Sequence, residues 1–531
     1  MAMPTAIKWT IDPIILAALV AVLLLQGCAT LPEDQRTAPA STAIPVSAQT
    51  ELGRLVPAGL AASALSAFRP LAFSAFALDA RLTLIRHAQR SIDMQYYLLQ
   101  DDATGRAVLR EVAGAADRGV RVRLLVDDLY TASSDRLLSD LAAHPNVELR
   151  LFNPFPAGRS SSLTRWTFAL FDFKRLNHRM HNKLLAVDGA FAVAGGRNIA
   201  DEYFFHSTSG NFIDFDLLVT GAAVADLEAC FDAYWNSPRV RTLESLEVDA
   251  RSLEDRRQDF ERLTTSTTPL AQLPEDERDA LNYRPLSRDI EHPPLRLLQG
   301  WVRVVADDPE KVSGRAADGH DATTVTAKVI DAIGHAREEA LISSPYFVPG
   351  SAGLDHLGAA RQRNVAITLI TNSMAANDEP FVSAAYGRYR KRMLEAGIQI
   401  YEVSPRLLHK QARLDEPLGE TRGQLHAKAL VIDHQTTFVG SMNFDFRSSR
   451  VNTELGLFVD SPELASDVTD LVATLRSIGT YRMRLSPRDG HVQWTASTPD
   501  AEEVFDSDPE IDGLTKLKLL LFSPFIDEGL L

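Results

Sequence analysis

The chain has 531 residues, of which 45% are hydrophobic and 24% charged, a composition typical of a globular protein long enough for two domains or one duplicated one. The formal net charge of −15 argues against a nucleic-acid-binding protein, which usually carries a basic patch, although a local basic pocket can sit on an acidic body. The two cysteines, Cys28 and Cys230, exclude a disulfide framework and argue against a cysteine-based metal site.

The N-terminus has the pattern of a lipoprotein signal. An unbroken apolar run over residues 14–25 has the length of a signal-peptide core and is short for a membrane span. Leu25-Gln-Gly-Cys28 then resembles the lipobox of bacterial lipoproteins, in which the cysteine is lipidated. We expect a periplasm-facing protein anchored at Cys28, with Ala29 favouring the outer membrane; an uncleaved N-terminal anchor is the alternative.

From residue 75 onward the pattern is that of an α/β fold. Hydrophobic periodicity predicts helices over residues 82–90 and 105–118 and strands over 91–98 and 120–126. The second half of the chain repeats this order, and residues 363–370 correspond to 118–125 at an offset of 245. The duplication therefore covers whole half-domains.

These patterns divide the chain into six segments. They are a signal peptide (1–27), a lipid-anchored flexible tether (28–74), a first half-domain (75–237), a charged helical connector (238–298), a second half-domain (299–480) and a C-terminal segment (481–531). The apolar end, residues 516–531, is interpreted as a helix or strand that closes the core, with membrane contact as the alternative.

One eight-residue phrase occurs twice. His181-Asn-Lys183-Leu-Leu-Ala-Val-Asp188 returns as His426-Ala-Lys428-Ala-Leu-Val-Ile-Asp433, and seventeen residues after each histidine comes an asparagine, Asn198 and then Asn443. Two copies in the same register with matching sequels indicate a duplicated catalytic half-site rather than coincidence.

Each phrase leads into a predicted strand. With a two-residue period, His181 and Lys183 point to one face and Asp188 to the other, and the second copy behaves in the same way. We therefore expect the histidines and lysines to share a site, whereas Asp188 and Asp433 stabilise the scaffold.

Two imidazoles, two ammonium groups and two amides that converge describe an anion site. One imidazole can attack phosphorus while the other protonates the leaving oxygen, and the lysine and asparagine donors stabilise charge that a metal stabilises elsewhere. We expect no cofactor and no metal, including at Asp127-Asp128, which has no histidine or further carboxylate cluster nearby in the sequence.

Each imidazole also needs an orienting partner, often a carboxylate. Glu454 is the candidate in the second half, and alignment of its strand with the first half gives Asp214 as the counterpart that orients His181, with Asp216 as the alternative. The two histidines titrate as a coupled pair.

The paired motifs resemble the HKD signatures of the phospholipase D superfamily over about residues 75–480, and several further segments resemble its bacterial cardiolipin synthase C-like branch. The resemblance implies two pseudo-symmetric α-β-α half-domains with mixed sheets and an active site at their interface. It also implies a metal-independent reaction through a phosphohistidine, with His181 as nucleophile and His426 as acid and base; the sequence alone allows the reverse. The chain departs from many members at Gly196, where they carry serine.

The resulting hypothesis is an envelope-bound phosphatidyltransferase that acts on phosphatidylglycerol or phosphatidylethanolamine at a membrane surface, without nucleic acid or an obligate protein partner. Transfer to phosphatidylglycerol would give cardiolipin, and transfer to water would give phosphatidic acid. The alternatives are a secreted HKD phosphodiesterase that acts on nucleic acid and a catalytically inactive scaffold. The retention of both histidines and both lysines argues against the scaffold.

Overall fold

The computed structural model describes residues 39–60, 63–155, 172–246, 249–266, 273–274, 276–313, 322–409, 422–497 and 502–511. The predicted signal peptide, Cys28 and the apolar residues 516–531 lie outside these ranges. Within them, we find no helix whose length and hydropathy would let it cross a bilayer.

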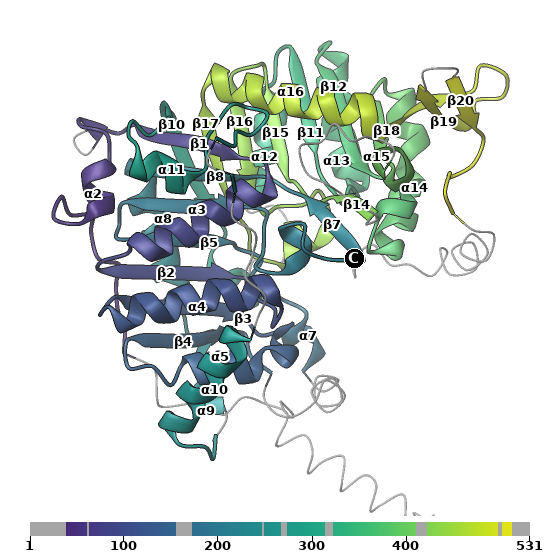
Figure 1. Cartoon of the computed structure of the whole chain (residues 1–531). Helices are drawn as coiled ribbons and strands as arrows, with labels where there is room; N and C mark the ends of the chain where they lie inside the picture. Colours follow the sequence, from purple (N-terminus) through teal and green to yellow (C-terminus); the bar gives the residue numbers. More distant parts are fainter. Residues whose placement is uncertain are drawn as a thin grey trace, which may run out of the picture.

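The strands of both halves form one sheet of eighteen strands in the described part of the chain (Figure 1). In the first half the neighbours run β9 (Val240–Thr242), β4 (Val147–Phe152), β3 (Arg121–Asp127), β2 (Ser91–Tyr96), β5 (Leu184–Val187), β6 (Phe191–Gly195), β8 (Asp216–Gly221) and β1 (Ser66–Leu71). Within this order β2, β3 and β4 are parallel to one another, and every other pairing is antiparallel.

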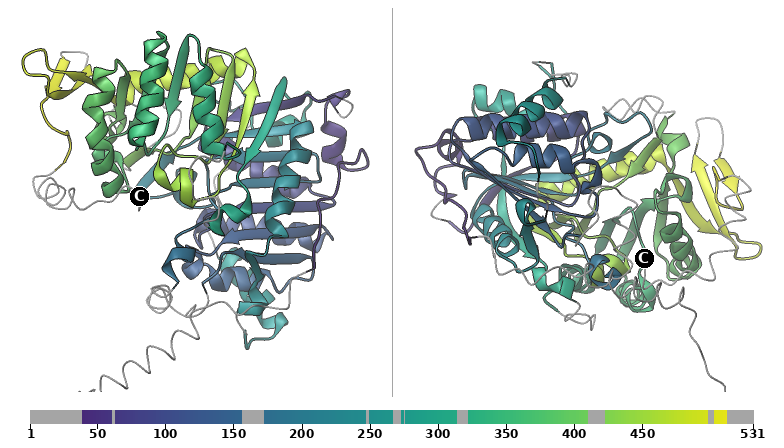
Figure 2. Two further views of the ribbon diagram at one scale, coloured as in Figure 1. Left: turned by 180° about the vertical axis from the view of Figure 1, so that it is seen from behind. Right: turned by 90° about the horizontal axis from the view of Figure 1, so that it is seen from below.

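The second half repeats this order on the other side of an antiparallel β1–β10 pairing. Its strands run β10 (Leu298–Ala306), β17 (Leu455–Asp460), β16 (Thr436–Gly440), β15 (Ala429–Ile432), β11 (Glu339–Ser343), β12 (Ala366–Asn372), β13 (Gln399–Val403) and β18 (Thr480–Leu485). Two further strands, β19 (Val492–Ser497) and β20 (Glu502–Phe505), extend the sheet at its outer edge (Figure 2). The predicted fold of two pseudo-symmetric halves with mixed sheets is confirmed.

Helices cover both faces of the sheet in each half (Figures 1 and 2). In the first half, α3 (Ser74–His87), α4 (Ala103–Asp117) and α5 (Asp135–Leu141) cover one face and α8 (Ala222–Trp235) the other. In the second half, α12 (Val325–His335), α13 (Gly350–Gln362) and α14 (Pro380–Glu395) cover one face and α16 (Pro462–Gly479) the other. Because α8 and α16 belong to one hydrophobic cluster, the core is continuous across the two halves.

Side-chain caps fix where several of these helices begin. Asp102 accepts the N–H of Gly105 at the start of α4, and Thr324 and Ser461 cap α12 and α16 in the same way. Such caps satisfy N–H groups that have no partner inside the helix. The sequence therefore encodes the helix starts locally, including α16, where Pro462 follows its cap.

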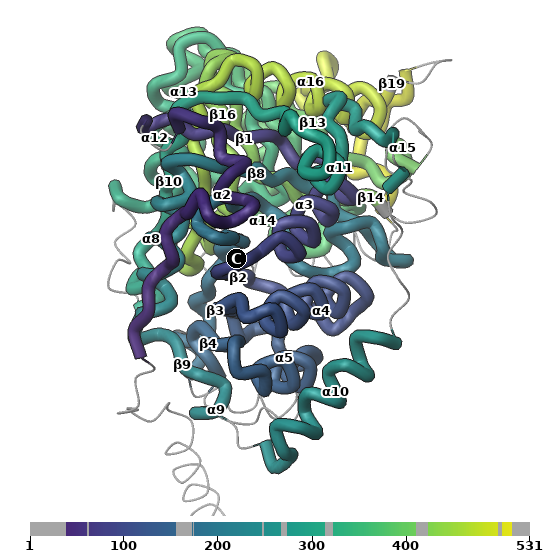
Figure 3. The backbone as a smooth tube through the Cα atoms, turned by 60° about the vertical axis from the view of Figure 1, so that its left-hand side comes forward, coloured from purple at the N-terminus to yellow at the C-terminus, as the bar shows by residue number. Residues whose placement is uncertain are grey.

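The prediction of a flexible tether up to residue 74 is wrong for the described residues from 39 onward. Residues 39–47 run along α8 (Figure 3), where Trp235 and Arg123 both donate to Ser41. Further on, α2 (Glu51–Leu55) precedes the fully buried strand β1, in which Arg69 pairs with Asp289 at 2.9 Å. An arginine and a proline inside β1 hide the apolar pattern of this strand from a sequence reading.

The segment predicted as a connector carries β9, α9 (Leu243–Leu246), α10 (Leu253–Thr265) and α11 (Leu286–Glu291). Phe260 of α10 and Leu286 and Ile290 of α11 are buried in the first-half core. Its helices therefore pack onto the first half rather than standing in solvent, while the charged side chains seen in the sequence cover their outer faces.

Candidate active site

The two repeated motifs meet where the halves meet, beside the carboxyl ends of the parallel strands. His181 lies between Met180 and β5, and His426 lies between β14 (Arg422–Leu425) and β15. The backbone N–H of His181 donates to the carbonyl of Thr453 at 2.9 Å, and that of His426 donates to the carbonyl of Ile213 at 2.8 Å. Each histidine is therefore bonded through its backbone to the opposite half, an arrangement extended by the parallel pairing of β14 with β7 (Gly210–Ile213) (Figure 1).

The orienting carboxylates also come from the opposite half. His181 Nδ1 lies 2.9 Å from Glu454 Oε2, and His426 Nδ1 lies 2.5 Å from Asp214 Oδ2. The expectation that Asp214 orients His181 is therefore wrong: both carboxylates are site residues, but their partners are exchanged. The physical reason is that Ile213 and Thr453 bond to the histidine of the other half, which brings the carboxylate that follows each of them to that histidine.

Asp216, the alternative considered for His181, has a different role. Its carboxylate pairs with Arg81 at 2.9 Å and Arg197 at 3.1 Å, and all three side chains are buried. This ion-pair cluster ties α3 and the turn after β6 to the start of β8. Asp216 therefore contacts neither histidine.

The two carboxylates are held differently. Glu454 accepts hydrogen bonds from Ser441 Oγ at 2.5 Å and Ser448 Oγ at 2.7 Å. In the first half the position of Ser441 is taken by Gly196, and a Cβ at that position would collide with the Asp214 carboxylate. The departure from the family pattern at Gly196 is thus explained: Asp214 occupies the space that a serine side chain would need.

Both motif lysines are buried next to their histidines. Lys183 Nζ donates to the carbonyl of His181 and Lys428 Nζ to that of His426, each at 2.6 Å. Burial lowers the pKa of Lys428 to about 8 and holds the pKa of Lys183 well below its ordinary value. Lys428 Nζ also lies 2.9 Å from His426 Nδ1, but that nitrogen cannot accept from the lysine while its proton is donated to Asp214.

The charge states follow from burial and pairing. Burial lowers the pKa of His181 to about 4 and also lowers that of His426, because the nearby lysines and the loss of water both oppose a charged imidazole. The partner histidines and lysines hold the pKa of both Glu454 and Asp214 below the ordinary range despite their burial. Each pair is therefore a neutral imidazole that donates from Nδ1 to a carboxylate, which leaves the Nε2 lone pair available.

Aromatic rings enclose both imidazoles. Tyr97 packs edge-on against His181 at 4.9 Å between ring centroids, and Tyr203 and Phe212 pack against His426 at 5.1 and 4.9 Å. Tyr97 directly follows the end of β2, a position that the sequence pattern makes visible, whereas Tyr203 and Phe212 carry no such signal. Only their spacing before Asp214 could have pointed to them.

The motif asparagines and aspartates bind backbone and neighbouring side chains. Asn198 donates to the Tyr203 hydroxyl at 2.8 Å and accepts the N–H of Leu98, while the buried Asn443 Oδ1 has no hydrogen-bond partner among the described residues. Asp188 accepts the N–H groups of residues 89–91, and Asp433 those of residues 337–339. Both aspartates therefore fasten the start of a parallel strand and lie away from the histidines.

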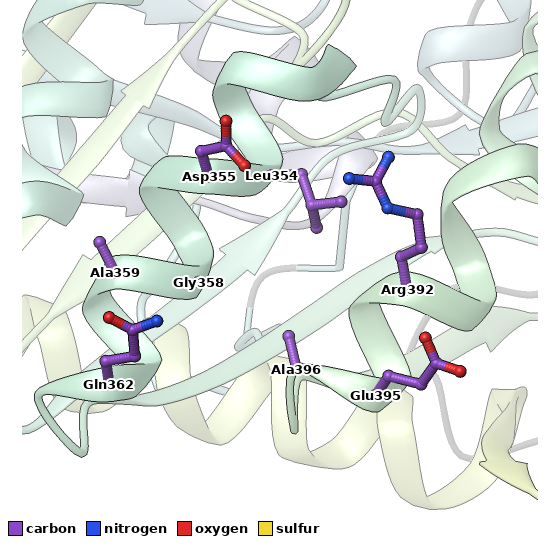
Figure 4. A pocket seen from close by; sticks show the side chains of 8 residues that line it. All are labelled: Leu354, Asp355, Gly358, Ala359, Gln362, Arg392, Glu395 and Ala396. Atoms are coloured by element: carbon purple, nitrogen blue, oxygen red, sulfur yellow. The ribbon is translucent and has the colours of Figure 1, made fainter.

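Two other kinds of feature could host chemistry, a metal site and a surface hollow. Among the described residues, no group of three or more His, Cys, Asp or Glu side chains is arranged to hold a metal ion. A hollow of about 460 Å³ between α13 and α14 is lined by residues such as Leu354, Asp355 and Arg392 (Figure 4). It contains no motif residue, so the site at the interface of the halves remains the catalytic candidate.

The family model described as cardiolipin synthase, PLD-like domain matches residues 82–235 and 329–475, one copy in each half. Since these matches cover more than half of the chain, the chain belongs to this branch of the phospholipase D superfamily. Among individual proteins, it is 36% identical over 452 residues to cardiolipin synthase C of Escherichia coli K12, an alignment that covers 83% of this chain and 91% of that protein.

Two other matches concern the sequence and the fold, respectively. Cardiolipin synthase 2 of Staphylococcus epidermidis is 26% identical over 71% of this chain and 61% of that protein. The crystal structure of phosphatidylserine synthase from Haemophilus influenzae Rd KW20 superposes with a TM-score of 0.55 at 14% identity, covering 92% of this chain and 96% of that one. At that identity the likeness is one of fold.

Proposed function

We propose that this protein is a metal-independent phosphatidyltransferase of the cardiolipin synthase type. One observation carries the proposal: two buried imidazoles, each with Nδ1 on a carboxylate from the opposite half, accompanied by two buried lysines. The 36% identity to a cardiolipin synthase over most of both chains supports the same conclusion.

In the first step, His181 Nε2 attacks the phosphorus of a glycerophospholipid. The P–N bond forms as the P–O bond to the headgroup breaks, and His426 Nε2–H gives its proton to the leaving oxygen. His426 is neutral in the empty site, but a bound phosphodiester anion raises its pKa, so that substrate binding loads the acid. Lys183 and Lys428 offset negative charge on the non-bridging oxygens.

In the second step the roles reverse. The hydroxyl of an acceptor attacks the phosphatidyl-histidine, His426 takes the hydroxyl proton, and the P–N bond breaks to return His181. The pseudo-twofold site suits this double displacement because attack and departure occur on opposite sides of the same phosphorus. The reverse assignment of the two histidines satisfies the same balance.

For substrates, we propose phosphatidylglycerol or phosphatidylethanolamine as the donor and phosphatidylglycerol as the acceptor. The products are then cardiolipin and free glycerol or ethanolamine. With water as the acceptor the product is phosphatidic acid.

The test is a reconstitution with detergent-solubilised protein and labelled phosphatidylglycerol, with and without phosphatidylethanolamine, followed by separation of the lipids. Wild-type protein is expected to form cardiolipin, and His181→Ala and His426→Ala to form none above background. His434→Ala, which removes an exposed histidine outside the site, is the control. Release of nucleotides from DNA with lipids left intact would instead favour the nuclease alternative.

We also propose that the protein is lipid-anchored at Cys28 in the bacterial envelope, facing the periplasm. Wild-type protein from cells grown with labelled palmitate should carry the label, whereas the Cys28→Ser variant should carry none and keep its activity in detergent micelles. Separation of the inner and outer membranes then assigns the compartment. Wild-type protein that is found in the membrane fraction without label would favour an uncleaved anchor.

A further inference from the structure

Two buried polar residues outside the catalytic set occupy matching places in the two halves. Asp127 ends β3 and Asn372 ends β12, and they are 245 positions apart, as are His181 and His426. Asp127 is fully buried and Asn372 is 2% exposed. Burying such groups is costly unless they are bonded, so their partners identify their role.

Asp127 binds the backbone next to the first histidine. Its Oδ2 accepts the N–H of Met180 at 2.9 Å, and its Oδ1 faces Arg179 Nη1 at 3.3 Å and the N–H of Leu129 at 2.9 Å. Met180 and Arg179 are themselves fully buried. The carboxylate therefore fixes the residue immediately before His181.

Asn372 does the same in the second half. Its Oδ1 accepts the N–H of Leu425 and its Nδ2 donates to the carbonyl of Leu425, both at 2.9 Å. Leu425 immediately precedes His426, as Met180 precedes His181. One amide thus satisfies both backbone groups of the preceding residue.

In each half two successive backbone N–H groups are therefore held from two directions. Asp127 holds Met180 and the carbonyl of Thr453 holds His181; in the second half Asn372 and the carbonyl of Ile213 hold Leu425 and His426. Combined with the carboxylate on Nδ1, this fixes both the backbone and the ring of each imidazole. Displacements of about 1 Å at a reacting group cost up to about 100-fold in rate, so this support matters for turnover.

We propose that Asp127 and Asn372 are positioning residues of the two catalytic histidines, each acting through the backbone of the preceding residue. The proposal rests on the proposed function in one respect: the two histidines must perform the chemistry. It assigns Asp127 a role in the site without a metal. It also predicts that the two residues affect different parts of the first step, since Asp127 supports the attack by the nucleophile and Asn372 the proton transfer from the acid.

The experiment uses the full-length protein and two phosphodiesters, bis(p-nitrophenyl) phosphate and a phospholipid, measured both in a single turnover and in the steady state. Nitrophenolate leaves without a proton, whereas glycerol or ethanolamine needs one. Asn372→Ala is expected to slow phospholipid cleavage about 10- to 100-fold with KM within about threefold, and to slow nitrophenolate release much less. Asp127→Asn is expected to slow both. If instead Asp127→Asn slows mainly phospholipid cleavage and Asn372→Ala slows both reactions, the positioning roles stand and the roles of the two histidines are reversed.

Asp127→Asn leaves the buried Arg179 without its carboxylate, so a second variant guards against misfolding. The position that matches Arg179 in the second half is Gln424, and Asp127→Asn with Arg179→Gln therefore gives the first half the pair that the second half uses. The double variant is expected to recover most of the rate lost in Asp127→Asn. A folded double variant as slow as the single one would contradict the equivalence of the two supports.

Thr220→Val is the matched control. Thr220 lies at the far end of β8, where its buried hydroxyl donates to the carbonyl of Ala190 at 2.7 Å, and the variant removes this one hydrogen bond. It should lower thermal stability without a change in kcat. If Asn372→Ala, like Thr220→Val, lowers thermal stability but leaves kcat on both substrates unchanged, the inference is wrong. If wild-type protein cleaves the nitrophenyl diester but makes no phosphatidyl product from lipid, the proposed function fails and the positioning roles can still be measured.

Discussion

At the scale of single residues, each histidine of the candidate active site is oriented by a carboxylate from the opposite half. The pairs His181–Glu454 and His426–Asp214 are chemically equivalent, yet their surroundings differ: two serine hydroxyls hold Glu454, whereas Gly196 leaves room for Asp214. This asymmetry makes one position much more sensitive to change than its counterpart.

Gly196→Ser, which restores the residue common in the family, should lower kcat about 100-fold or more because its Cβ displaces Asp214 from His426. The converse change, Ser441→Gly, removes one hydrogen bond to a charged group and should cost about 10-fold. Steady-state kinetics with thermal unfolding as the folding control measure both. An active Gly196→Ser variant would mean that Asp214 can shift without loss of function.

The pH dependence follows from Lys428. Its pKa of about 8 lies well below that of an exposed lysine because the side chain is buried, so it carries its charge below about pH 8 and loses it above. We expect kcat/KM to fall as the pH rises through this value, since the neutral amine binds the phosphate less strongly. A profile of kcat/KM together with the affinity for inorganic phosphate tests this, and a flat profile up to about pH 10 would contradict it.

At the scale of elements, residues 39–47 form an N-terminal strap across the first half (Figure 3). Arg123 and Arg150 donate to backbone carbonyls of the strap at 3.0 and 2.7 Å, and Asp232 accepts the N–H of Ala43. Both arginines are buried, and the strap supplies each of them with a backbone acceptor.

A chain that begins at residue 48 should therefore be less stable than one that begins at residue 39. Each buried donor left without an acceptor costs about 1–3 kcal/mol, which for the two arginines in a chain of this length corresponds to a Tm lower by roughly 2–6 °C. Differential scanning calorimetry of the two shortened proteins, both without Cys28, measures the difference. Equal Tm values would mean that water replaces the strap at these arginines.

At the scale of the whole molecule, the site is a property of the interface and not of either half. Each half supplies a histidine and a lysine, but the carboxylate of each histidine and the acceptor of its backbone N–H come from the other. The β1–β10 pairing and the shared cluster between α8 and α16 hold the two halves in the one arrangement in which these contacts form.

Mixing full-length His181→Ala and His426→Ala proteins should therefore not restore activity, because each site is completed within one chain. Lipid product formation in the mixture, compared with each protein alone, is the measurement. If chains exchanged halves, the statistics of pairing would restore roughly a quarter to a half of the wild-type rate. Activity at that level would contradict a self-contained site.

Much of this organisation is readable from the chain. The duplicated phrase, the strand periods and the helix caps are local patterns, and local patterns determine element type and the chemistry of the side chains. They predicted the two halves, the histidines and lysines that lie together, and the placement of Asp188 and Asp433 away from the histidines, where both bind backbone N–H groups. The buried strand β1 was not predicted, because Arg69 and Pro70 interrupt its apolar pattern.

The sequence by itself therefore determined which residues are the candidates to carry the reaction, since a duplicated motif repeats its chemistry wherever the two copies are placed. Only the tertiary structure decided which carboxylate pairs with which histidine. Glu454 meets His181 across 273 residues and Asp214 meets His426 across 212, and such contacts depend on how two packed halves face each other. The same holds for Asp127 and Asn372, whose role appears only where a strand end touches the backbone before a histidine.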